Sequence, residues 1–111
     1  MSHAIERILR LAGFTPVVFP SAEALLEAKG TPDAGCLIFD VHLPGLSGFQ
    51  LRQRLVAMGH SPPVIFITAY DEPESREQAT SAGAVALMIK PFSGNALVEK
   101  VAGAMAAPAD P

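Results

Sequence analysis

Two uninterrupted apolar runs constrain the fold of this chain more than any other feature. Residues 36–39 read CLIF and residues 64–67 read VIFI, and neither run alternates with polar residues. Such runs are typical of strands that are buried on both faces of a parallel sheet. Parallel neighbours need crossover connections, which are usually helices. The sequence therefore predicts an α/β fold, with a doubly wound parallel sheet between two layers of helices.

Helix and strand signals alternate along the whole chain. Apolar residues at helical spacing, serines at helix starts and glycines at helix ends mark the helices. Because proline has no N–H to donate, Pro16 indicates that the strand expected at 15–19 begins late in that run or lies at an edge of the sheet. We expect one domain over residues 1–105 and a frayed tail over 106–111. The expected elements are a helix at 5–12, a strand at 15–19, a helix at 22–28, a strand at 36–39, a helix at 48–58, a strand at 64–67, a helix at 74–82, a strand at 85–89 and a helix at 94–105.

The composition is that of a small globular domain. The chain has 111 residues, 50% of them hydrophobic and 17% charged, which suits a single core. The net charge of −3 argues against a nucleic-acid binder, and no apolar run could span a membrane. The single cysteine, Cys36, excludes an internal disulfide and has apolar neighbours, which indicates a buried, inert thiol. We therefore expect a soluble cytoplasmic protein that contacts neither nucleic acid nor membrane.

Polar residues follow three of the predicted strands. Asp40, Thr68 and Lys90 each stand at or just after a strand's carboxyl end. In an open parallel sheet these ends line one crevice, where ligands bind. A carboxylate can attack phosphorus and hold it as an acyl phosphate, while a lysine and a hydroxyl stabilise the phosphoryl oxygens. Asp40 alone could equally be a turn residue, but the three together favour a phosphoryl-accepting site.

Four segments resemble a bacterial response-regulator receiver domain, of the subfamily that usually precedes a helix-turn-helix output domain. They cover nearly the whole chain and read AGFTPVVFPSAEALL, CLIFDVHLPGLSGFQL, PPVIFITAYDEPE and AGAVALMIKPF. The resemblance implies a flavodoxin-like fold with strand order 2-1-3-4-5. It also implies phosphorylation of Asp40 by a sensor histidine kinase or phosphotransfer protein, a Mg²⁺ cofactor, switch roles for Thr68 and Lys90, and a cis Lys90–Pro91 bond.

The family's first strand, and the acidic pair that follows it and holds Mg²⁺, have no counterpart in this sequence. The remaining metal ligands would be the Asp40 carboxylate and the main-chain carbonyl of His42, so we expect weak Mg²⁺ binding. Asp71 and Glu72 are either substitute ligands or solvated loop charges.

The absent strand would lie between the second and third strands and leave a slot in the sheet. Either residues 15–19 close onto the next strand, or another chain fills the gap, or the natural start lies upstream. We expect a homodimer, with exchange of residues 1–19 as one way to form it.

Three further residues are candidates for switching or access. Leu87 stands where receiver domains usually carry an aromatic switch residue, and leucine has no polar tip. Tyr70 is either a surface-packed tyrosine or a lid over Asp40, and His42 lies two residues after Asp40.

The sequence is compatible with two functions. The first is a stand-alone receiver in two-component signalling, without enzymatic activity beyond slow self-catalysed phosphotransfer and dephosphorylation. The second is a degenerate receiver kept as an interaction or dimerisation module.

The order G-L-S-G at 45–48 does not match the G-x-S-x-G of a hydrolase nucleophile, and Ser47 is better explained as a helix cap.

Overall fold

Three parallel strands form the sheet, in the order β1-β2-β3. The computed structural model describes residues 2–27, 35–43, 45–60 and 62–106, and within them β1 is Leu37–Asp40, β2 is Val64–Thr68 and β3 is Ala86–Ile89. The central strand, β2, is buried along its whole length, as its continuous apolar sequence predicts. These three strands match the predicted strands at 36–39, 64–67 and 85–89 to within a residue or two.

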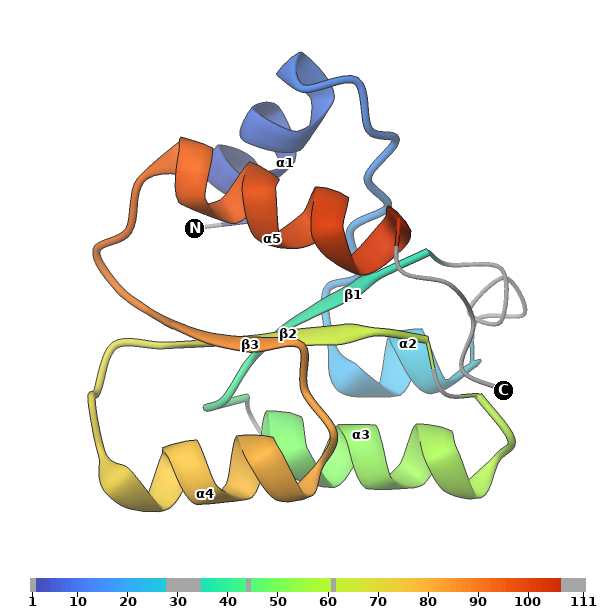
Figure 1. The fold of residues 1–111 in the computed structure, drawn as a ribbon. Coiled ribbons are helices and arrows are strands. Elements are labelled where there is room, and N and C mark those ends of the chain that lie inside the picture. The colour runs from blue at the N-terminus through green and yellow to red at the C-terminus, as the bar shows by residue number, and fades with distance from the viewer. Residues whose placement is uncertain (1, 28–34, 44, 61, 107–111) are drawn as a thin grey trace.

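Helices cover both faces of the sheet (Figure 1). α1 (Ser2–Leu11) and α5 (Gly94–Ala106) lie on one face, and α2 (Ala22–Glu27), α3 (Gly48–Ala57) and α4 (Pro73–Ser81) lie on the other. Successive strand residues point to opposite faces, so each strand supplies both cores. In β2, Phe66 packs into the core beneath α2, α3 and α4, whereas Ile65 packs toward α1 and α5. This arrangement is the predicted doubly wound α/β fold.

Three serines cap helices as the sequence predicts. The hydroxyl of Ser21 accepts the N–H of Ala24 at 3.1 Å, and that of Ser93 accepts the N–H of Ala96 at 3.0 Å. Ser47 forms a capping box with Gln50, because its hydroxyl accepts the Gln50 N–H while the Gln50 side chain accepts the Ser47 N–H. Ser47 is therefore a cap, as predicted.

The prediction of a strand at 15–19 is wrong. These residues are irregular and make no backbone hydrogen bond to another described residue. Val17 is 73% exposed and Val18 46%, so the β-branched side chains lack the packing that a strand needs. Among the described residues, the segment does not close onto β1, which is the end strand of the sheet. A strand forms only with a hydrogen-bonding neighbour, and none of the described residues provides one for this segment.

The last helix extends to Ala106, one residue beyond the predicted end of the domain, and residues 107–111 of the expected tail lie outside the described residues. The predicted end of the second helix at 28 also lies outside them. Within the described ranges, no helix is long and apolar enough to cross a membrane.

Cys36 is half-buried immediately before β1, and burial raises the pKa of its thiol from 9.0 to about 11. At pH 8 the native thiol is therefore protonated, and its thiolate fraction is about 100-fold lower than in the unfolded chain. Labelling with a disulfide reagent at pH 8 should be at least tenfold slower in the native protein than in urea, and should accelerate as the pH rises toward 11. Equal rates in the native and unfolded protein would contradict this assignment.

Candidate functional site

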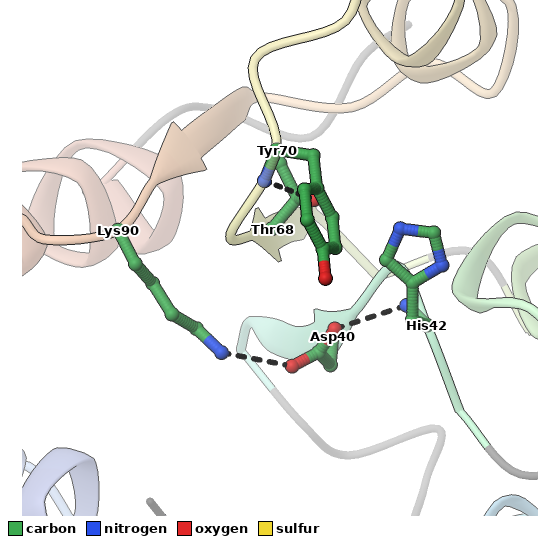
Figure 2. A network of polar contacts seen from close by, with 5 residues as sticks. All are labelled: Asp40, His42, Thr68, Tyr70 and Lys90. Atoms are coloured by element: carbon green, nitrogen blue, oxygen red, sulfur yellow. Dashed lines mark hydrogen bonds and ion pairs between the residues drawn. The ribbon is translucent and has the colours of Figure 1, made fainter.

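The sheet brings the three predicted residues to one rim. Asp40 ends β1, Thr68 ends β2 and Lys90 follows β3. The Val41 N–H donates to the Ile67 carbonyl at 2.8 Å, and the Lys90 N–H donates to the Thr68 carbonyl at 2.8 Å. These bonds continue the ladder past the strand ends, so the side chains that follow each strand lie at one edge of the sheet (Figure 2).

Asp40 and Lys90 form an ion pair at the centre of this rim. Lys90 Nζ lies 3.1 Å from Asp40 Oδ2, and each side chain is 26% exposed. The other carboxylate oxygen, Oδ1, accepts the main-chain N–H of His42 at 2.9 Å. A carboxylate accepts about four hydrogen bonds, so lone pairs remain on both oxygens. The carboxylate is thus oriented from two sides and still reachable from solvent. The Lys90–Pro91 peptide bond is cis, as the resemblance implied.

Thr68 is fully buried below the rim. Its hydroxyl oxygen accepts the main-chain N–H of Tyr70 at 3.1 Å. A hydroxyl also has a proton of its own to donate, so this contact does not use the group that a phosphoryl oxygen needs.

Tyr70 and His42 stand at the mouth of the site. Their rings meet edge to face with centroids 5.5 Å apart, and Tyr70 is 59% exposed. Figure 2 shows the hydroxyl end of Tyr70 turned toward the side of the site that holds Asp40. Leu87, the fourth residue before Pro91, lies opposite Phe66 in the sheet and packs against the core on the α3 and α4 side.

Gly48 is a site residue that reasoning from the sequence passed over. A Cβ on Gly48 would lie 2.5 Å from the main-chain oxygen of Asp40 and 3.3 Å from the Phe66 ring. The Gly48 N–H also donates to the Val41 carbonyl at 2.8 Å. The loop after Asp40 can therefore fold back closely only onto glycine. The available signal was the second glycine of the D-x-x-L-P-G…G pattern.

The described residues do not complete a carboxylate-rich Mg²⁺ site. Among them, no three His, Cys, Asp or Glu side chains group closely enough to hold a metal ion. Asp71 instead pairs with Arg76, whose Nε lies 2.8 Å from Asp71 Oδ1. Glu72 is exposed on the same loop. The Asp40 carboxylate and the His42 carbonyl remain the candidate ligands, and Glu72 and Glu74 line a pocket together with His42.

Comparison with known proteins decides the family. The family model for the response regulator receiver domain matches residues 1–102. The chain belongs to this family. The receiver domain is accordingly a part of two-component signalling, and receiver domains as a family bind Mg²⁺.

Curated relatives and solved structures agree with this assignment. The receiver domain is 33% identical over 104 residues to nodulation protein W of Bradyrhizobium diazoefficiens, covering 94% of this chain and 46% of the relative. It is 32% identical to the transcriptional regulatory protein FixJ of the same organism, covering 95% and 51%. The chain thus spans about half the length of the curated relatives it matches. The crystal structure of FixJ-N gives a TM-score of 0.84 at 29% identity, covering 97% of this chain and 86% of that one. A receiver protein from Burkholderia phymatum gives 0.79 at 36% identity, covering 96% and 87%.

Gly48→Ala should destabilise the receiver domain by about 1–3 kcal/mol, because the new methyl group overlaps the Asp40 main chain. Gly103→Ala is the matched control, since a Cβ there meets nothing within 4 Å inside α5. Alanine in a helix should stabilise by about 0.4–1 kcal/mol. Urea unfolding of both variants measures the difference. Equal stability of the two variants would show that the loop can move away from Gly48 freely.

Mg²⁺ should bind weakly, because the described residues include no cluster of three His, Cys, Asp or Glu side chains that could draw the ion out of water. Calorimetric titration should show no saturation below about 1 mM. Saturation in that range that is lost in Glu72→Gln but retained in Glu77→Gln would show that Glu72 acts as a substitute ligand.

Proposed function

We propose that this receiver domain accepts a phosphoryl group on Asp40 from a sensor histidine kinase or a phosphotransfer protein. One observation carries the proposal: Lys90 Nζ lies 3.1 Å from Asp40 Oδ2 at a solvent-accessible rim. A carboxylate beside a fixed cation is the pair that acyl phosphate formation needs, since the carboxylate attacks and the cation offsets the phosphoryl charge.

In the proposed step, one Asp40 oxygen forms a bond to phosphorus while the phosphorus–nitrogen bond of a phosphohistidine breaks. The leaving imidazole keeps the electron pair and takes up a proton. The charge on the transferred group spreads over its oxygens. Lys90 then lies within reach of one of these oxygens, because it already contacts the attacked carboxylate.

Thr68 would carry the signal away from Asp40. Its hydroxyl can donate its proton to a phosphoryl oxygen while the hydroxyl oxygen still accepts the Tyr70 N–H. Leu87 lies on the neighbouring strand, opposite Phe66, where a rotamer change can follow movement at the strand ends. We assign the switch to Thr68, Lys90 and Leu87, and access to Tyr70 and His42.

The second candidate is a degenerate receiver that serves as an interaction module. It is favoured by the lack, within the described part of the chain, of any cluster of acidic residues around Asp40. In both cases we propose a homodimer in the cytoplasm that contacts neither nucleic acid nor membrane, consistent with the net charge of −3.

Incubation with a small phosphodonor and Mg²⁺, followed by intact-mass measurement, should give one adduct that is stable in acid and labile in base. The adduct should disappear in Asp40→Asn. Asp71→Asn is the control, because Asp71 is exposed and paired with Arg76 outside the rim. An adduct that persists in Asp40→Asn would contradict the assignment of Asp40 as the phosphoryl acceptor. No adduct in any variant would favour the interaction module.

A further inference from the structure

A pocket of about 250 Å³ opens beside the rim, between the residues that lead into α3 and the first two turns of α4. Both helices cover the same face of the sheet (Figure 1). His42 lines the pocket, and its main-chain N–H also orients the Asp40 carboxylate. The pocket and the rim are therefore neighbours that share one residue.

Ser75 presents an unpaired hydroxyl to this pocket. The residue lies in the first turn of α4 and is only 7% exposed. Its hydroxyl makes no hydrogen bond to another residue of the described chain, whereas every side-chain nitrogen or oxygen that is fully enclosed there has a partner. The hydroxyl is therefore not enclosed, and the space that it faces is the pocket that Ser75 lines. A ligand that bonds this hydroxyl removes the cost of leaving a buried polar group unpaired.

Two carboxylates line the same pocket without a cation beside them. Glu72 precedes α4 but its side chain does not cap the helix, and Glu74 follows in the first turn. Neither forms an ion pair within the described residues, and the adjacent Arg76 binds Asp71 instead. The α4 wall of the pocket thus offers negative charge and free hydrogen-bond acceptors.

Apolar side chains complete the lining. Val41 is 3% exposed and Phe49 is 8% exposed, and both contribute to the pocket. Long cationic side chains bury their methylene stems along such surfaces while the charged end stays at polar groups. The pocket therefore combines a surface for a stem with acceptors for a cationic end.

We propose that this pocket binds the side chain of an arginine from a partner protein. A guanidinium group is planar and has five N–H donors and no acceptor, which matches the carboxylates of Glu72 and Glu74 and the hydroxyl oxygen of Ser75. The start of a helix by itself attracts anions, but the two carboxylates oppose one here.

The proposal deepens the function proposed above and rests on it for the identity of the partner. A phosphodonor protein has to bring its phosphohistidine to Asp40, and His42 belongs to both the rim and the pocket. An arginine near the phosphohistidine of that protein is therefore the side chain that reaches Glu74 and Ser75. It would orient the donor, since a bidentate contact between arginine and a carboxylate fixes direction as well as adding energy.

Titration of the receiver domain with blocked arginine (N-acetyl-arginine amide), followed by NMR of the backbone amides, tests the pocket directly. The Ser75 and Gln78 amides should shift together, with a dissociation constant in roughly the millimolar range. Blocked citrulline has nearly the same shape but no charge, and should bind about fivefold more weakly. Glu74→Gln should weaken arginine binding about threefold. Glu77→Gln is the matched control, because Glu77 is exposed on the same helix but does not line the pocket.

Three results would overturn the proposal. The first is equal binding of arginine and citrulline, and the second is equal weakening in Glu74→Gln and Glu77→Gln. The third is a shift of the Ser75 amide with inorganic phosphate but not with arginine, which would indicate an anion site at the start of α4.

Asp40→Asn separates the pocket from phosphoryl transfer. This variant should lose the phosphoryl adduct and still bind blocked arginine like the wild type, because Asp40 does not line the pocket. Loss of arginine binding in Asp40→Asn would place the arginine on the rim and contradict the assignment to the pocket.

Discussion

The hydrogen bonds that extend the parallel ladder beyond the strand ends hold the rim of this receiver domain together. Val41 donates to Ile67, and Lys90 donates to Thr68, each at 2.8 Å. Because β2 is buried along its length, its position is set by packing on both faces. β1 and β3 are each registered against β2, so the ends that carry Asp40 and Lys90 take their places from one rigid strand.

The loop after Asp40 depends on this arrangement in turn. Gly48 approaches the Asp40 main chain more closely than any side chain would allow, and Ser47 caps α3 at the same point. The start of α3 is therefore fixed against the end of β1. The N–H of His42 is thereby available to orient one oxygen of Asp40, while Lys90 orients the other. The carboxylate geometry is a product of strand register and helix capping together.

Among the described residues, the strand that carries Asp40 is paired on one side only. Leu37 and Phe39 of β1 are nevertheless buried by side-chain packing, so the edge is stabilised through its faces rather than by a second ladder. A partner strand would stabilise the backbone of β1 directly.

Local sequence determined much of this protein. The apolar runs specified β1 and β2, the serines specified helix starts, and the polar residues at strand ends identified Asp40, Thr68 and Lys90 as neighbours. These features follow from periodicity and hydrogen-bonding groups close in the chain. The tertiary structure alone decided whether residues 15–19 pair, that Asp71 binds Arg76, that Tyr70 packs on His42, and that Gly48 must lack a side chain. Each of these features depends on which backbone or side chain, distant in the sequence, lies next to the residue in the folded protein. β-branched residues such as Val17 and Val18 do not form a strand without a hydrogen-bonding neighbour.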